Sequence, residues 1–149
     1  MSVGEYCNRD VIVSDRSATV LQIAQLMRHH HVGDVIITEE SSHGRVPVGI
    51  VTDRDIVIEM LAPEVDLSSC VASDIMSYEL VTVKETDGVW EALQRMRTRG
   101  VRRVPVVNSN NTLVGVITAD DLLELFNEQL SDLIRAISKE QRREKEKRK

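Results

Sequence analysis

The sequence lacks long apolar runs and has very little cysteine. No stretch of its 149 residues is apolar over the length that a membrane-spanning helix requires. Its first residues contain no basic stretch followed by an apolar one, which is the pattern of a secretory signal peptide. The two cysteines, Cys7 and Cys70, form no Cys-x-x-Cys motif, which argues against a zinc site and a disulfide framework. We therefore expect a soluble, cytoplasmic protein with reduced thiols and no membrane partner.

The sequence also lacks an excess of basic residues outside its C-terminal tail. Residues 139–149 hold seven Lys or Arg against three Glu, a charge of +4, whereas the whole chain carries −5 and the rest therefore about −9. Nucleic-acid binders usually present a broad basic face, because phosphate neutralisation supplies much of their affinity. The acidic body thus argues against nucleic acid as a partner. The tail is typical of a solvated helix end, with an anion-docking tail as the alternative.

What the sequence does contain is an internal repeat. Residues 5–37 align with residues 74–106 without a gap at an offset of 69, which pairs Gln25 with Gln94 and Met27 with Met96. After a connection three residues longer in the first copy, residues 48–55 align with residues 114–121 at an offset of 66. One copy of this size cannot bury its own apolar face, so we expect the two to pack together.

Each copy has the pattern strand, helix, strand, strand, helix. The expected elements of the first copy are a strand over 10–14, a helix from Thr19, strands over 35–37 and 48–51 around a polar turn at 38–45, and a helix from Thr52 to Ala62. Those of the second copy are a strand over 80–83, a helix over 89–98, strands over 104–107 and 113–117, and a helix from Thr118. The inner stripe of the first closing helix is expected at Ile56, Val57, Met60 and Leu61, and Trp90 and Met96 are expected in the core.

These patterns place the first repeat at 2–62, a linker at 63–73, the second repeat at 74–130 and an extension at 131–149. The last helix continues past the length of the repeat with apolar residues at a spacing of three or four. We call this set the apolar seam: Leu122, Phe126, Leu130, Leu133 and Ile137. Such a seam needs a partner, either the body of the same chain or a second copy in a symmetric dimer, and we favour the homodimer.

Both copies end in the motif Gly-x-x-Thr-x-x-Asp, at residues 49–55 and 115–121. Together with the run Val101-Arg102-Arg103-Val104-Pro105-Val106-Val107, the doubled motif resembles a tandem pair of cystathionine β-synthase (CBS) domains, a Bateman module, over about residues 2–130. It looks closest to small stand-alone bacterial proteins made of such a pair. The resemblance implies an α/β fold (α+β) of two β-α-β-β-α units related by a pseudo-two-fold axis, with an extended C-terminal helix. It also implies clefts for adenosine-containing ligands: AMP, ADP, ATP, NAD or S-adenosylmethionine.

The chemistry of the motif suits such ligands. A Thr at a helix start lies beside unpaired backbone N–H groups, where the helix dipole favours a phosphate. A carboxylate three residues later can accept both hydroxyl groups of a ribose. Thr52 with Asp55, and Thr118 with Asp121, would each hold one nucleotide. The alternative is that each pair is only a capping box, which satisfies the amides of the helix start without any ligand.

The two copies differ beside the motif. Arg103 stands where related adenylate-sensing modules use a basic residue to reach phosphate, whereas the first copy has Asp34 there. We therefore expect the site of Thr118 and Asp121 to be the better occupied. Val83, Val104 and Pro105 are expected to contact the adenine ring. An exposed Arg103 paired with an acid is the alternative reading of that residue.

Three classes of function are compatible with this sequence. The first is a non-catalytic regulatory module that binds an adenosine-containing ligand and acts on an unknown downstream protein. The second is a structural dimer or stress-associated scaffold with vestigial nucleotide sites. The third is an enzyme that uses the paired carboxylates, which we do not expect because no nucleophile with an adjacent base is evident. No protein-bound metal is expected either, and Mg²⁺ would enter only with a nucleotide.

Overall fold

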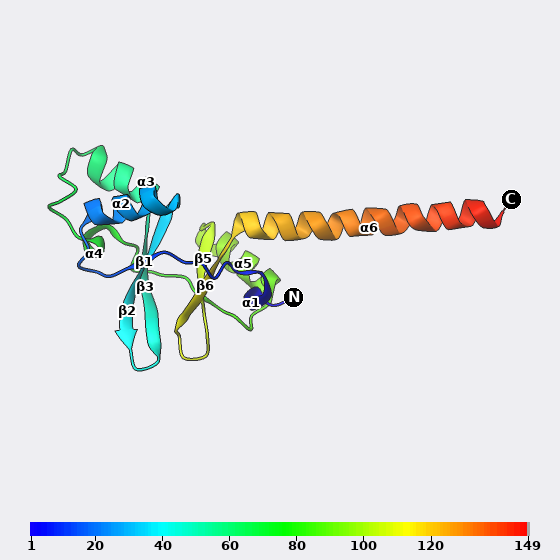
Figure 1. Ribbon diagram of the computed structural model, residues 1–149, viewed down its shortest axis with the longest axis horizontal. Coiled ribbons are helices and arrows are strands. Elements are labelled where there is room, and N and C mark those ends of the chain that lie inside the picture. The colour runs from blue at the N-terminus through cyan, green and yellow to red at the C-terminus, as the bar shows by residue number, and fades with distance from the viewer. Residues whose placement is uncertain (149) are drawn as a thin grey trace.

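The computed structural model describes residues 1–148 and contains two similar lobes and one long helix. The elements of the first repeat are α1 (Val3–Tyr6), β1 (Val13–Ser14), α2 (Val20–His30), β2 (Asp34–Ser41), β3 (Gly44–Thr52), α3 (Asp53–Ile56) and the π-helix η1 (Val57–Leu61). Those of the second repeat are α4 (Ala72–Ile75), β4 (Val83–Lys84), α5 (Val89–Arg99), β5 (Arg103–Val107), β6 (Leu113–Thr118) and α6 (Ala119–Lys147). Figure 1 shows α6 extending far from the body to the C-terminus.

Each repeat forms its own three-stranded sheet. The strand orders are β1-β2-β3 and β4-β5-β6, with the first pair parallel and the second antiparallel in both. One core lies on each sheet under its helices, and the two cores occupy equivalent positions in the repeats. The structure therefore confirms the predicted α/β fold of two β-α-β-β-α units with an extended C-terminal helix.

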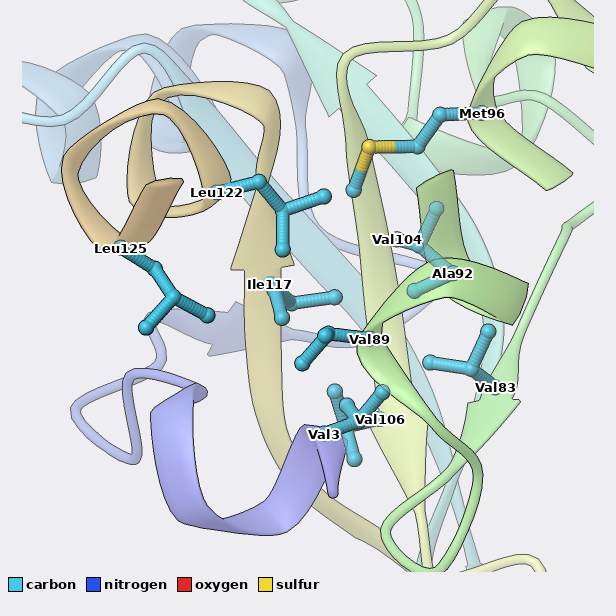
Figure 2. Packing of buried hydrophobic residues seen from close by; sticks show 10 residues of the cluster. All are labelled: Val3, Val83, Val89, Ala92, Met96, Val104, Val106, Ile117, Leu122 and Leu125. Carbon is cyan, nitrogen blue, oxygen red and sulfur yellow. The ribbon is translucent and has the colours of Figure 1, made fainter. Parts of the chain in front are cut away.

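The short helices that open the repeats are exchanged between them. Val3 of α1 is fully buried in the core of the second repeat, where Figure 2 shows it beside Val89 and Val106. The Val3 amide also donates to the carbonyl of Asp87 at 2.8 Å. Conversely, Ala72 of α4 is fully buried in the core of the first repeat. Each repeat thus completes its core with a segment that precedes the other, which makes the two folding units interdependent.

The glycine of each repeated motif permits this exchange. A Cβ atom on Gly115 would lie 2.7 Å from the carbonyl oxygen of Asn8, just after α1. A Cβ atom on Gly49 would lie 2.5 Å from the Sδ atom of Met76, just after α4. Real Cβ atoms do not approach other atoms so closely, so a residue without a side chain is needed where the incoming segment crosses the strand.

Two expectations about the first repeat were wrong. The polar turn expected at 38–45 is mostly strand, because β2 and β3 continue their antiparallel pairing to Ser41 and Gly44, with Ser42 and His43 at the tip. The inner stripe of the closing helix is also narrower than expected. Ile56 and Met60 are buried, whereas Val57 and Leu61 are 50% and 64% exposed, because the helix changes to a π-helix at Val57 and the stripe shifts.

One aromatic residue was also misplaced by the sequence pattern. Met96 is buried as expected, but Trp90 is 59% exposed and stacks on Phe126 of α6, with ring centroids 4.7 Å apart. The smaller Val89 and Ala92 fill the inner face of α5 instead. In the described residues, no helix combines the length and the apolar character that crossing a membrane requires.

Candidate ligand-binding site between the repeats

The Thr and Asp residues of both motifs form complete capping boxes. At the start of α6, the Thr118 hydroxyl accepts from the Asp121 amide at 3.1 Å, and Asp121 Oδ2 accepts from the Thr118 amide at 2.9 Å. At the start of α3, Thr52 and Asp55 make the same two bonds at 3.2 and 2.9 Å. Both pairs therefore form a capping box, and each helix start is satisfied by the protein itself.

The capping boxes still leave groups for a ligand. A hydroxyl that accepts one hydrogen bond keeps its own proton to donate. In the described part of the chain, the second carboxylate oxygen of Asp121 and of Asp55 accepts no hydrogen bond from the protein. All four residues are only partly buried. Each motif thus presents one donor and one charged acceptor, the groups that a phosphate oxygen and a ribose hydroxyl require.

An ion pair joins the two motifs across the repeat boundary. Arg103 opens β5 opposite Thr118, and Asp34 opens β2 opposite Thr52, so each charged residue shares a sheet face with its motif threonine. Arg103 Nη1 donates to Asp34 Oδ1 at 3.2 Å and to the Gly33 carbonyl at 3.3 Å. The two half-sites therefore meet at Arg103 and Asp34, which occupy equivalent positions in the repeats.

Asp34 is held in an unfavourable environment for a carboxylate. Burial is the main cause that raises the pKa of Asp34 above its ordinary value, and the negative charge of Asp53 adds to it. The guanidinium of Arg103 opposes this shift but does not cancel it. The side chain of Asp34 is 24% exposed and that of Arg103 is 33% exposed, so the pair is partly shielded from water. Arg103 is accordingly the cation that offsets part of the cost of ionising this partly buried acid.

The apolar residues expected around the adenine ring lie on different faces. Val83 and Val104 are buried in the core of the second repeat, where they pack under α5 (Figure 2). Pro105 follows Val104 along β5 and therefore shares the face of Arg103, opposite Val116 of β6, and it is itself buried. Of the three residues, only Pro105 has its side chain on the face of the candidate site, and Val83 and Val104 support the sheet from behind.

The charge pattern of the site is inverted between the repeats. Asp34 and Asp53 of the first repeat correspond to Arg103 and Ala119 of the second, and the Asp53 amide donates to the Gly33 carbonyl at 3.0 Å. The role of Asp53 in this pattern was not predicted from the sequence. The available signal was its alignment, at the offset of 66, with the uncharged Ala119. The half-site of the first repeat is therefore acidic, and that of the second contains Arg103, which reaches across to it.

Other surface features are formed by different residues. One cleft is lined by residues 13–17, 38–40 and Arg45 at the edge of the first sheet, and another by residues 80–82 and the α5 face around Arg95. Within residues 1–148, no group of three or more His, Cys, Asp or Glu side chains is arranged to hold a metal ion. His29, His30 and His31 are exposed at the end of α2.

Comparison with known families identifies the repeats. The family model described as CBS domain matches residues 3–62 and 72–128. The chain belongs to the CBS domain family. This confirms the resemblance found in the repeated motif, and it agrees with the two sheets and the doubled capping boxes.

Curated relatives include other CBS proteins and a longer chain. The CBS domain-containing protein YhcV of Bacillus subtilis is 32% identical over 92% of this chain and 95% of its own length. The protein MK0525 of Methanopyrus kandleri is 39% identical over 84% of this chain, but the matched region spans only 62% of that relative. Small stand-alone CBS pairs therefore occur among the similar proteins, beside relatives with additional sequence.

Solved structures of CBS pairs include ligand complexes. The CBS domain protein PAE2072 from Pyrobaculum aerophilum, complexed with AMP, is 31% identical, with a TM-score of 0.73 over 85% of this chain and 99% of that one. The CBS domain pair of protein MJ0100, in complex with 5′-methylthioadenosine and S-adenosyl-L-methionine, is 25% identical, with a TM-score of 0.73 over 85% and 99% of the two chains. CBS pairs similar to this chain thus bind adenosine-containing ligands.

Proposed function

We propose that this CBS pair is a non-catalytic regulatory module that binds an adenosine-containing ligand beside Thr118, Asp121 and Arg103. AMP, ADP, ATP, NAD and S-adenosylmethionine are the ligands considered. Mg²⁺ would enter only with a nucleotide. The observation that carries the proposal is the cross-strand pairing of Arg103 with Thr118, which puts a guanidinium beside a helix start that still offers a hydroxyl and a carboxylate oxygen.

Each part of such a ligand has a matching group. The ribose hydroxyls would donate to the free carboxylate oxygen of Asp121, and a phosphate would accept from Thr118 and Arg103. Pro105 lies on the same face of the sheet but is itself buried, so it supports the site from within. Thr52 and Asp55 repeat the ribose-binding groups in the first repeat, but Asp34 replaces the arginine there and repels phosphate. The second-repeat site is therefore proposed as the primary one.

The second candidate function is a structural dimer or scaffold with vestigial sites. It is favoured by one observation, the partners that the site residues already have within the protein: the capping boxes are closed and Arg103 is paired with Asp34. In this alternative the polar cluster would serve only to join the repeats. A homodimer belongs to both proposals because the apolar seam of α6 extends beyond the body. A downstream protein partner and a cytoplasmic location stay predictions.

Calorimetric titration with AMP, ADP, ATP, NAD, S-adenosylmethionine, 5′-methylthioadenosine and adenosine tests the proposal directly. Saturable binding of at least one of these ligands without turnover is the expected result. Asp121→Asn should then weaken the binding of every ribose-containing ligand by about ten- to a hundredfold, since a hydrogen bond to a charged group contributes about 1.5–3 kcal/mol. The amide oxygen of Asn can still accept from the Thr118 amide, so the helix start keeps its cap.

Asp55→Asn is the matched control, because it makes the same change in the other motif. It should affect the main binding event little if the second-repeat site is primary. Arg103→Ala should weaken AMP more than adenosine, since only AMP carries a phosphate. If none of the seven compounds binds at millimolar concentration, the result would instead support the scaffold.

A further inference from the structure

The outer part of α6 carries apolar side chains that nothing in the described chain covers. Leu122 and Leu125 are buried against the body, and Phe126 stacks on Trp90. Beyond them, Leu130, Leu133 and Ile137 of the apolar seam are 55%, 59% and 51% exposed, and Ile134 beside them is 56% exposed. An amphipathic helix gains most of its stability when its apolar face packs against a partner, and here that face is in water. This part of α6 is therefore a docking surface.

The charges along α6 are separated into two halves. Residues 119–134 contain five acidic residues and no Lys or Arg. Residues 135–147 contain six Lys or Arg against three Glu, a net charge of +3. Because α6 is one continuous helix, the helix has an acidic half near the body and a basic half at its free end. The seam residues Leu130, Leu133 and Ile137 lie across the boundary between these halves.

We propose that the seam is covered by α6 of a second copy of this chain, running antiparallel. Antiparallel pairing places the basic half of each helix beside the acidic half of the other, whereas parallel pairing would place like charges together. A straight helix that points away from the body cannot fold back onto its own domain, so the partner comes from another molecule (Figure 1). This inference rests on the proposed homodimer and specifies its surface and orientation.

The spacing of the seam fixes the register. The steps from Phe126 to Leu130, Leu133 and Ile137 are four, three and four residues, the alternation of a two-stranded coiled coil. Antiparallel alignment of Leu130 with the partner's Leu133 also brings Phe126 level with the partner's Ile137, so each layer is apolar. The two-fold axis then passes between residues 131 and 132.

This register also aligns the charges along the helices. Glu128 becomes level with the partner's Arg135, and Glu124 with the partner's Lys139. Trp90, exposed beside Phe126, widens the apolar surface at the level that the partner's Ile137 reaches. Charge and apolar pattern thus select the same antiparallel arrangement.

The mass of the protein in solution, measured by light scattering after gel filtration, tests the pairing. A dimer is expected for the wild type and a monomer for Leu133→Asp, with both repeats still folded because Leu133 lies outside their cores. Val57→Asp is the matched control, since Val57 is an equally apolar residue, 50% exposed, on η1 rather than α6. A dimer that survives Leu133→Asp would leave the homodimer standing and overturn the α6 surface. A wild-type monomer would overturn both the homodimer and its α6 surface. This would hold even if a different protein covered the seam.

A spin label measures the orientation. Cys7 and Cys70 are replaced by Ser, and Gln141→Cys carries the label near the free end of α6. In the antiparallel register the two labels are nineteen residues apart along the axis, about 28 Å at the rise of an α-helix. In a parallel pair they would be about 10 Å apart, the spacing of packed helices. A short distance would overturn the antiparallel orientation.

Gln129→Cys, close to the two-fold axis, is the control that should give a short distance in either orientation. Ligand titration of the same variants reports separately on the proposed function.

Discussion

At the scale of single residues, the ion pair with Asp34 would limit how far Arg103 is available to the proposed ligand. The carboxylate holds the guanidinium at 3.2 Å, so a phosphate at the second-repeat site has to displace it or share the arginine with it. A phosphate would also approach a negative charge at Asp34 and a second one at Asp53. The first repeat therefore contributes an acid that competes with the phosphate of the ligand proposed for the second.

Asp34→Asn should strengthen the binding of AMP. The substitution releases Arg103 and removes one repulsive charge, and its effect should be about three- to tenfold, on the order of 1 kcal/mol for a partly exposed ion pair. Adenosine has no phosphate and should bind unchanged, so it is the control within the same titration. Weaker AMP binding by the variant would show that Asp34 positions Arg103 for the ligand rather than competing with it.

The same residue predicts a dependence of stability on pH. Because the pKa of Asp34 is raised in the folded state, the folded chain binds a proton more readily than the unfolded chain. The cost of the buried charge is fully present above the folded pKa and disappears below the unfolded value of about 3.9. Asp34→Asn should therefore be more stable than the wild type at pH 7, and the difference should shrink towards pH 4. Urea midpoints across this range measure it, and a difference that grows on acidification would contradict the assignment.

The site residues were only partly predictable from the sequence. Thr118, Asp121 and Arg103 follow from the repeated motif and the alignment of the copies. The contact between Arg103 and Asp34 does not, because it depends on how the two sheets face each other across the pseudo-two-fold axis. Val83 and Val104 were assigned to the ligand on their apolar character, which equally suits the core that they occupy.

At the scale of elements, the helices α1 and α4 were absent from the sequence reading. Each has only four residues, too few for an apolar period to be visible. Each is nevertheless essential to a core, because Val3 and Ala72 are fully buried in the opposite repeat. The extended hairpin of β2 and β3 was missed for a different reason: Thr38–Ser41 is polar, and its pairing is set by the backbone ladder rather than by burial of an apolar face.

Val3→Ala tests the exchange of these helices. The substitution removes two buried methyl groups and should lower the free energy of unfolding by about 2 kcal/mol. Because Val3 packs in the second repeat, hydrogen exchange should accelerate first in β4–β6 and not in β1–β3, although Val3 precedes the first repeat in the chain. Val57→Ala, at an exposed position, should leave both stability and exchange nearly unchanged. Faster exchange confined to β1–β3 would contradict the exchange of α1.

At the scale of the whole molecule, the ligand site and the assembly surface that we propose lie in separate parts of the chain. The candidate site lies at the start of α6, between the repeats, whereas the exposed seam lies beyond Phe126. One continuous helix connects them, since α6 begins at the capping box of Thr118 and Asp121 and ends in the basic tail. A ligand that changed the contact between Arg103 and Asp34 would thus act at the base of the helix that we propose as the pairing surface.

Removal of residues 130–149 should separate assembly from binding. The shortened chain keeps Leu122, Leu125 and Phe126, so its core and its ligand site are complete, and its affinity for AMP should equal that of the full chain. It should be a monomer, and its melting temperature should not depend on protein concentration. The full chain should melt at a higher temperature when its concentration is raised a hundredfold, because dimerisation stabilises the folded state by mass action. If the shortened chain still melts in a concentration-dependent way, the copies associate through the body, and α6 serves another partner.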